Sequence, residues 1–529
     1  MTPLSSLLFE RPLLLDGGMG TQILLRRPTA DDFGGKDFEG CMELLSERRP
    51  EWIQAIHQAY FDAGSDAVET NTFGANEVVL GDFGIAHRAE ELNVKAVALA
   101  REVARSYDRP RFVIGSVGPG TKLLTLGHIA YAELYRSYLA QMRGLVKGGA
   151  DAILIETSQD LGQVKLAVAA ARDAMAEQRV RIPLWAQVTV ESSGTLLLGS
   201  EMAAVITTLE ALGVDVLGLN CGTGPDEMRA PLQALHEQSP FAISCLPNAG
   251  LPVNQGGQLV YPMTPELFAE KVAHHVREFG LSITGGCCGT TPEHIRALSV
   301  RLAGESAPAP RRGVAEGSVS SLYVSVPLRQ EPAPSIVGER TNANGSKAFR
   351  EMLAREDWDG LVSIARDQQK EGAHMLDVCV AYVGRDEARD LAEYVRRLAT
   401  QVTLPLMIDS TEPAAIEAAL QAAPGKCMVN SINFEDGEAK ARRILDLCKR
   451  YGAAVVGLTI DEQGMARTRE HKLAVARRLH RLVVEECGFH PSDLILDTLT
   501  FTLGSGEEGS RSAALETLGA IEDIKRELP

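Results

Sequence analysis

The feature that most constrains the fold is a repeated alternation of short apolar runs with longer amphipathic segments. Eight such runs follow one another in the first 300 residues, and stretches with helical spacing, such as 130–149, lie between them. Strands that alternate with helices pair in parallel and are covered on both faces. Eight units of this length predict an α/β fold, a (β/α)8 barrel of TIM type. The expected strands are Leu13–Met19, Ala67–Phe73, Phe112–Gly118, Ala152–Ser158, Leu184–Val190, Val216–Cys221, Phe241–Asn248 and Ser282–Cys288.

A second series of the same kind follows a segment rich in proline, serine, alanine and glycine. This segment, 304–334, is typical of a linker, with one short strand expected at Leu322–Val326. We therefore expect one domain over 1–303 and another over 335–529, ending in a helix over 510–527. Six strands do not close a barrel of this type, so we expect a second TIM-type barrel that is incomplete at its C-terminus; an open sheet is the alternative. Its strands are Ser335–Thr341, Met375–Val380, Leu404–Ser410, Cys427–Ile432, Ala454–Ile460 and Leu494–Phe501.

Composition and charge argue against several classes of protein. The chain is 45% hydrophobic and 23% charged, as in soluble globular proteins, and no run has the roughly 18 to 20 apolar residues of a membrane helix. The N-terminus lacks the basic region and cleavage site of a signal peptide, so we expect a cytoplasmic protein. The 53 basic and 70 acidic residues give a net charge of −17, which argues against nucleic acid and anionic membranes as partners. Nine cysteines do not form the dense, even set of a secreted disulfide framework.

Cysteines occur where two of the expected strands end, which is where TIM-type barrels carry their active sites. Strand 6 ends in Asn220-Cys221-Gly222, and strand 8 ends in Gly285-Gly286-Cys287-Cys288-Gly289. Only one strand separates these two around the ring, so the three thiols can meet over one side of the barrel mouth. Three thiolates that leave a fourth position open are typical of a catalytic zinc site. The sequence therefore predicts Zn²⁺ bound by Cys221, Cys287 and Cys288; the alternative is a set of buried cysteines beside a glycine turn.

Other polar residues end neighbouring strands of the same barrel. Strand 1 ends in Asp16-Gly17-Gly18, strand 4 ends in Glu156-Thr157, strand 2 carries Glu69-Thr70-Asn71-Thr72, and strand 7 ends in Pro247-Asn248. A thiol on zinc is deprotonated and becomes a nucleophile, and we expect Asp16 and Glu156 to hold the ammonium group of such a substrate. Backbone amides at Gly17 and Gly18 can hold its carboxylate. Asp16, Glu156 and Asn220 are the candidate catalytic residues, although Asp16 also suits a helix cap and Glu156 a salt bridge at the rim.

The motifs LLLDGGMGT, ETNTFGAN, LIET, GLNCGTGP and GGCCGTTPEHI together resemble the zinc-dependent homocysteine S-methyltransferase family. The resemblance covers nearly all of residues 1–300. It implies a (β/α)8 barrel in which Cys221, Cys287 and Cys288 bind zinc. It also implies that the sulfur of homocysteine takes the fourth position on the metal and attacks a methyl donor.

Carboxylates and amides also lie near the strand ends of the second domain. Such a ring suits a heterocycle with alternating hydrogen-bond donors and acceptors, such as a pterin, although each residue alone is more often a helix N-cap. We expect the folate-binding residues to be Glu339, Asn342, Asp377, Asp409, Asn430 and Asp497.

The motifs SIVGERTNANGSKAF, GAHMLDVCV, PLMIDST, VNSIN and LILDTLTF resemble the pterin-binding family. Within it they resemble the methyltetrahydrofolate-binding domains of cobalamin-dependent methionine synthases. The resemblance implies that Asp377, Asp409, Asn430 and Asp497 contact the pterin, and that a weakly acidic network surrounds N5. The chain departs from many relatives at Cys379, where they have Asn, and at Thr498, where they have Pro.

The order of the two domains implies a methyltransferase that acts on two substrates through a carrier. A methyl group passes from 5-methyltetrahydrofolate to cobalamin and then to homocysteine, in two in-line displacements, giving methionine and tetrahydrofolate. The cobalamin signature Asp-x-His-x-x-Gly does not occur in the 529 residues, so we expect cobalamin on a module or partner outside this chain. One alternative is a homocysteine methyltransferase that uses S-methylmethionine or betaine. Another is a zinc or thiol sensor, which would have a fourth protein ligand on its metal.

Overall fold

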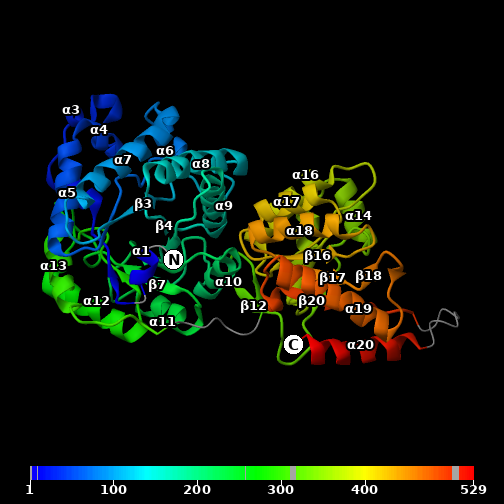
Figure 1. Ribbon diagram of the computed structural model, residues 1–529. Coiled ribbons are helices and arrows are strands. Elements are labelled where there is room, and N and C mark those ends of the chain that lie inside the picture. The colour runs from blue at the N-terminus through cyan, green and yellow to red at the C-terminus, as the bar shows by residue number, and fades with distance from the viewer. Residues whose placement is uncertain (1–2, 9, 257, 310–316, 503–511, 529) are drawn as a thin grey trace. The chain divides into compact units, whose positions relative to one another are not determined.

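The computed structural model describes residues 3–8, 10–256, 258–309, 317–502 and 512–528 (Figure 1). The chain divides into two compact units, Met1–Val314 and Ala315–Pro529. Within the described residues, no helix is both long enough and apolar enough to cross a membrane.

The first unit is an eight-stranded parallel barrel, as the sequence predicted. Its strands follow the order β1-β10-β7-β6-β5-β4-β3-β2. The two ends of this order meet, because the N–H of Asp66 donates to the carbonyl of Leu14 at 2.7 Å and the N–H of Leu14 donates to the carboxylate of Asp66 at 3.0 Å. The strands are β1 (Leu13–Leu14), β2 (Ala67–Glu69), β3 (Phe112–Val117), β4 (Ala152–Ser158), β5 (Leu184–Val188), β6 (Val216–Asn220), β7 (Ala242–Leu246) and β10 (Ile283–Thr284).

Helices surround this barrel because each has an apolar face (Figure 1). In α8 (Tyr131–Gly148), Leu134, Tyr138, Met142 and Leu145 are buried at helical spacing, and the helix ends at Gly149, whose φ of 86° is left-handed. A hairpin of β8 (Val253–Gln255) and β9 (Gln258–Val260) follows β7. The other helices are α1 (Pro3–Leu7), α2 (Met19–Leu25), α3 (Ala30–Phe33), α4 (Leu45–Arg48), α5 (Pro50–Ala63), α6 (Glu77–Gly81), α7 (Ala89–Ala104), α9 (Leu161–Glu177), α10 (Met202–Leu212), α11 (Arg229–Gln238), α12 (Pro265–Phe279) and α13 (Pro292–Arg301).

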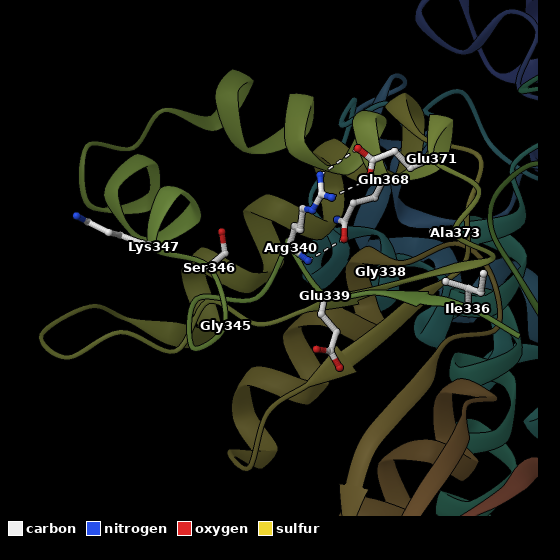
Figure 2. Close-up of a pocket in the computed structure, with 10 residues that line it drawn as sticks. All are labelled: Ile336, Gly338, Glu339, Arg340, Gly345, Ser346, Lys347, Gln368, Glu371 and Ala373. Carbon is white, nitrogen blue, oxygen red and sulfur yellow. Dashed lines mark hydrogen bonds and ion pairs between the residues drawn. The ribbon is translucent and has the colours of Figure 1, made fainter. Parts of the chain in front are cut away.

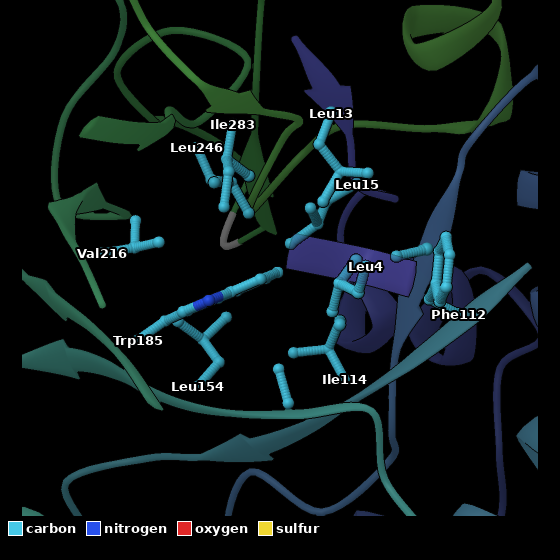
Figure 3. Close-up of a cluster of buried hydrophobic side chains, with 12 residues drawn as sticks. Leu4, Leu13, Leu15, Phe112, Ile114, Leu154, Trp185, Val216, Leu246 and Ile283 are labelled. Carbon is cyan, nitrogen blue, oxygen red and sulfur yellow. The ribbon is translucent and has the colours of Figure 1, made fainter. Parts of the chain in front are cut away.

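Apolar side chains fill the amino-terminal end of the barrel (Figure 3). Phe112, Val216 and Ile283 are the first residues of their strands, and all three belong to a buried cluster that includes Trp185. Leu4 of α1 packs into the same cluster and is 1% exposed. Burying side chains of this size stabilises the fold by roughly 1.5–3 kcal/mol each. This end is therefore sealed, and polar side chains gather at the other end.

Strand pairing in the first unit stops earlier than the sequence predicted. β1 ends at Leu14 rather than Met19, and β10 ends at Thr284 rather than Cys288. The backbone leaves the sheet where the polar residues begin; Cys221, directly after β6, has a left-handed φ of 56°. The residues predicted as the last part of these strands therefore belong to the loops that carry the candidate site.

The second unit contains six parallel strands in the order β13-β14-β15-β16-β17-β20, in agreement with the six predicted strands. Within the predicted linker, where the sequence suggested one strand, the structure has an antiparallel hairpin of β11 (Ser318–Ser320) and β12 (Ser325–Pro327). Val319 of this hairpin packs against Met375 and Met428, the first residues of β14 and β16. The parallel strands are β13 (Val337–Gly338), β14 (Met375–Val378), β15 (Leu406–Asp409), β16 (Met428–Ile432), β17 (Ala454–Leu458) and β20 (Leu494–Asp497).

Helices follow the strands of the second unit as in the first. The C-terminal helix α20 (Ala513–Glu527) covers most of the range predicted for it, 510–527, of which 510 and 511 lie outside the described residues. An ion pair between Arg469 and Asp523 joins it to α19. The remaining elements are α14 (Lys347–Ala354), α15 (Trp358–Lys370), α16 (Glu387–Gln401), α17 (Pro413–Ala422), α18 (Glu438–Tyr451), α19 (Arg469–His480) and the hairpin β18 (Ile460–Asp461) with β19 (Gly464–Met465).

Candidate functional site

The three cysteines predicted to bind metal lie together at the carboxyl end of the first barrel. Their Sγ atoms all lie within 4.8 Å of one another, and those of Cys221 and Cys288 are 3.8 Å apart. Four ligands around zinc with Zn–S bonds of about 2.3 Å place two sulfurs about 3.8 Å apart, so the cluster fits this metal. In the part of the chain that the structure describes, no histidine, aspartate or glutamate joins the cluster.

The end of β7 fixes the backbone of all three cysteines, because β7 lies between β6 and β10 in the sheet. Each cysteine N–H donates to a different residue after or at the end of this strand. The side chain of Asn248 receives one of these bonds, which gives that residue a positioning role. The pairs are Cys221 with the carbonyl of Leu246 at 3.1 Å, Cys287 with the carbonyl of Pro247 at 2.9 Å, and Cys288 with Oδ1 of Asn248 at 3.0 Å.

Close packing explains the glycine that follows the cysteine pair. Gly289 has a left-handed φ of 78°, and a Cβ atom at this position would lie 2.2 Å from the ring of Tyr261. The hydroxyl of Tyr261 hydrogen-bonds to Cys288. Only glycine allows the backbone to pass this ring while Cys288 faces the other two thiols.

The cysteine cluster is an anionic site. Hydrogen bonds from the thiols of Cys221 and Cys287, together with one from Tyr261, lower the pKa of Cys288 to about 3. The hydrogen bonds that Cys287 makes to Cys221 and Cys288 raise the pKa of Cys287 well above its usual value. Of these thiols, Cys288 is therefore the most readily ionised, and its thiolate form favours the approach of a cation.

Three buried carboxyl groups interact with one another in the same barrel. Asp16 is 1% exposed and Glu156 is 5% exposed, and burial raises the pKa of Asp16 well above its usual value and that of Glu156 to about 7. Burial, followed by the charges of Glu156 and Asp16, also raises the pKa of Glu69. Asp16 accepts the N–H of Glu69 at 3.1 Å. A positively charged ligand beside these groups would stabilise their ionised forms.

Asn220 connects these carboxyl groups to the cysteines. Its Nδ2 donates to Oε2 of Glu156 and to Oγ1 of Thr157, both at 2.9 Å, and its Oδ1 accepts the N–H of Thr157 at 2.7 Å. Thr157 has a left-handed φ of 56°, which is unusual for a β-branched residue. Because Asn220 directly precedes Cys221, one buried side chain fixes both Glu156 and the start of the loop that carries Cys221.

The predicted carboxylate-binding amides lie close to Thr290. The N–H of Gly18 donates to Oγ1 of Thr290 at 3.0 Å, so this amide is already engaged within the protein. A Cβ atom on Gly17 would lie 2.5 Å from the same oxygen. The tight turn brings the loop after β1 against the loop after β10, next to the cysteines.

In the second unit, four of the six predicted folate residues come together. Nδ2 of Asn342 donates to Oδ2 of Asp377 and to Oδ2 of Asp409, both at 2.7 Å, and the side chain of Asn430 lowers the pKa of Asp377. Burial raises the pKa of Asp377 to about 6 and raises that of Asp409. Oδ1 of Asp377 is buried and has no hydrogen-bond partner, so the cluster has an acceptor ready for a ligand donor.

The other two predicted folate residues lie apart from this cluster. Glu339 is exposed and lines a cavity of about 550 Å³ beside β13, where Arg340 pairs with Glu371 (Figure 2). Asp497 is exposed and accepts the N–H of Leu499 at 2.7 Å. Within the described residues, neither carboxylate hydrogen-bonds to the Asn342 cluster.

Some site residues had no role in the sequence interpretation. Glu69 and Asn248 were visible as polar residues at strand ends, but their partners depend on which loops meet. Tyr261 follows a hairpin about 27 residues before Cys288 in the sequence, and no motif signals its contact with that thiol.

Two family models match the chain. Homocysteine S-methyltransferase matches residues 13–302, and Pterin binding enzyme matches residues 338–529. A curated methionine synthase from Mycobacterium tuberculosis is 48% identical over 534 residues, and one from Mycobacterium leprae is 46% identical over 538 residues. Each alignment covers 100% of this chain and 44% of the relative, so the chain spans less than half the length of either relative.

Among solved structures, the chain is similar to the homocysteine methyltransferase MmuM from Escherichia coli in its oxidized and metallated forms. Both comparisons give 25% sequence identity and a TM-score of 0.47. They cover 57% of this chain and 100% of the other.

Proposed function

The chain belongs to the homocysteine S-methyltransferase family, and from this premise we propose that it forms the homocysteine- and folate-binding part of a cobalamin-dependent methionine synthase. The proposed reaction moves the methyl group of 5-methyltetrahydrofolate, by way of cobalamin, to the sulfur of homocysteine. Its products are methionine and tetrahydrofolate. The observation that carries the proposal is the cluster of three Sγ atoms within 4.8 Å of one another at the mouth of the first barrel.

Cys221, Cys287 and Cys288 would hold Zn²⁺. When bound, zinc lowers the pKa of a further thiol ligand, so that a substrate sulfur becomes nucleophilic at neutral pH. The 3.8 Å separation of two of the sulfurs supports this metal. Three protein ligands leave the fourth position to the substrate, as in other catalytic zinc sites.

Asp16 and Glu156 would hold the ammonium group of homocysteine. Both are buried carboxyl groups with raised pKa values, and a cation beside them would lower those values and release their protons. Asn220 keeps Glu156 in place through a 2.9 Å hydrogen bond. These contacts would orient the substrate with its thiol toward the cysteines and its carboxylate toward the turn at Gly17 and Gly18, where the amide of Gly17 is the candidate donor because that of Gly18 is bonded to Thr290.

The second unit would bind 5-methyltetrahydrofolate over the Asn342 cluster. The unpartnered Oδ1 of Asp377 is an acceptor for an N–H group of the pterin ring. Asp409 and Asn430 add an acceptor and an amide to the same surface, and we place Glu339 and Asp497 at its periphery. With a pKa of about 6, Asp377 can exchange a proton near neutral pH, which suits a reaction whose leaving amine must be protonated.

Cobalamin would be carried by a module or partner beyond these residues. Each substrate would be bound by its own unit, and the carrier would take the methyl group from the folate and deliver it to homocysteine. The proposed setting is the cytoplasm, with no nucleic acid or membrane partner.

The proposal is tested by zinc content and by zinc X-ray absorption with and without L-homocysteine. We expect about one zinc per chain, which gains a sulfur ligand on addition of homocysteine. Cys287→Ala should abolish zinc binding, whereas Cys245→Ala, a buried cysteine of β7 outside the cluster, should leave it intact. A zinc already closed by four protein ligands, and unchanged by homocysteine, would contradict the proposal.

Assays of methyl transfer test the donor. With a cobalamin-binding module added, the chain should form methionine from homocysteine and 5-methyltetrahydrofolate. Activity with S-methylmethionine or betaine in place of the folate would instead establish a different homocysteine methyltransferase.

A further inference from the structure

Glu69 has a side chain with no role in the fold. It is the last residue of β2, and its N–H donates to both carboxylate oxygens of Asp16, at 3.2 and 3.1 Å. Among the described residues, Oε1 of its carboxylate is buried without a hydrogen-bond partner. Leaving a buried acceptor unsatisfied costs about 1–3 kcal/mol, and more for a charged group. Such a group calls for an explanation, and a ligand that completes its hydrogen bonds supplies one.

The surroundings of Glu69 indicate what kind of ligand this is. The charges of Glu156 and Asp16 both act on its carboxylate. Among the described residues, no lysine, arginine or histidine forms an ion pair with Glu69, Asp16 or Glu156 within 4.0 Å. Three carboxyl groups without a cationic partner are costly to ionise together. They therefore call for a cation from outside the protein.

We propose that Glu69 is a specificity-determining residue that accepts a hydrogen bond from the primary ammonium group of the thiol substrate, together with Asp16 and Glu156. This inference rests on the proposed function and assigns a third residue to the same substrate. A primary ammonium has three N–H donors, one for each of the three carboxylates. The match selects substrates with a free amino group.

The same geometry excludes thiols that lack a free amino group. An N-acylated thiol, such as a cysteine within a peptide, has no charge at its nitrogen and at most one N–H donor. Binding it would leave buried carboxylates unpaired, and sites of this kind discriminate strongly against ligands that lack the required group. Through Glu69 the site thus recognises the amino group of the substrate as well as its sulfur.

Glu43 provides a matched control. It is also a buried glutamate of the first barrel, 8% exposed, but its Oε1 accepts the N–H of Gly74 at 2.8 Å. Its carboxylate is therefore engaged within the protein. Glu43→Gln and Glu69→Gln make the same chemical change, and only the second removes a carboxylate that we assign to the ligand.

The experiment compares two thiols on the zinc-loaded chain by isothermal titration calorimetry. One is L-homocysteine, and the other is 4-mercaptobutanoate, which is homocysteine without its amino group. Because a hydrogen bond to a charged group contributes about 1.5–3 kcal/mol, Glu69→Gln should weaken homocysteine roughly 10- to 100-fold. Binding of 4-mercaptobutanoate should stay within about twofold of the unsubstituted chain, since that ligand does not use Glu69.

Equal weakening of both thiols, or no change for either, would overturn the role of Glu69. Zinc content measured on the same samples shows whether the variant is folded, and Glu69→Ala should give the same selective loss by a different change of shape. Glu43→Gln should bind both thiols as the unsubstituted chain does. If the unsubstituted chain binds neither thiol, the proposed function fails together with this assignment, and that outcome is distinct from a failure of Glu69 alone.

Discussion

Replacing Asn220 with alanine should both destabilise the first unit and impair its site. The side chain is 1% exposed and makes three hydrogen bonds, two to Thr157 and one to Glu156. A hydrogen bond to a carboxylate contributes about 1.5–3 kcal/mol and a neutral one about 1 kcal/mol, so the change removes roughly 3–5 kcal/mol. A whole domain is stable by only about 5–15 kcal/mol, so the loss is a large share of the total.

A second effect of this substitution is specific to Glu156. The bond from Asn220 lowers the pKa of Glu156, against burial, which raises it to about 7. Without that bond the pKa rises further, and more of the carboxyl is protonated at neutral pH. Because ammonium binding needs the ionised form, homocysteine affinity should fall, and fall more at pH 6.5 than at pH 8.5.

Asn93→Ala is a control that separates the loss of stability from the loss of homocysteine affinity. Asn93 is fully buried, and its Nδ2 donates to the carbonyls of Ala75 and Ala89, both at 2.8 Å. Its loss should cost roughly 2–3 kcal/mol with no effect on homocysteine affinity.

The assay is urea unfolding followed by the fluorescence of Trp185, which is 1% exposed in the core of the first barrel. Replacing Trp52 and Trp358, the other tryptophans among the three in the chain, with phenylalanine isolates its signal. A loss below about 1 kcal/mol for Asn220→Ala would refute the reasoning. So would a fall in homocysteine affinity of the same size in Asn93→Ala.

Three further predictions concern the other contacts. Asn342→Ala should weaken folate binding roughly 10-fold or more, because Asp377 and Asp409 lose the side chain that holds them. Asn344→Ala should leave folate binding unchanged. Equal effects of the two substitutions in equilibrium dialysis would contradict the role of Asn342. The raised pKa of Asp377, about 6 against 3.8, means that the folded state holds its proton more tightly than the unfolded state. The second unit should therefore lose up to about 3 kcal/mol as the pH rises from below 3.8 through about 6, and urea midpoints of Asp377→Asn should lack this component. Gly289→Ala should lower zinc affinity, measured by competition with a chelator, because its Cβ would lie 2.2 Å from the ring of Tyr261; unchanged affinity would count against that contact.

The existence and order of the strands were predictable because short apolar runs alternate regularly with amphipathic segments along the chain. The ends of the strands were not predictable. The run Leu13–Met19 looks like one strand in sequence, yet β1 ends at Leu14. A strand ends where its backbone loses a partner, and the partner of β1 is β10, nearly 270 residues away along the chain. The pattern of residues around Leu14 contains no information about where β10 ends.

The same limit applies to the site. Cys221, Cys287 and Cys288 could be placed together because the barrel rule fixes the relation between strands 6 and 8. Glu69 was visible as a polar residue, but its unsatisfied Oε1 follows from the packing of side chains from several strands. The contact between Tyr261 and Cys288 depends on a loop whose path no periodicity describes.

Both units hold their carboxylates with asparagine rather than with a basic residue. Asn220 donates to Glu156, and Asn342 donates to Asp377 and Asp409. An arginine at either position would make stronger bonds, but it would also neutralise the charge and fill the acceptors. An amide keeps a carboxylate in place and leaves its charge available. Burial raises the pKa values of Glu156 and Asp377, and the asparagine bonds offset only part of that rise. Oε1 of Glu69 and Oδ1 of Asp377 stay unpartnered, because a site that is to take up a ligand donor cannot satisfy those oxygens from within the protein.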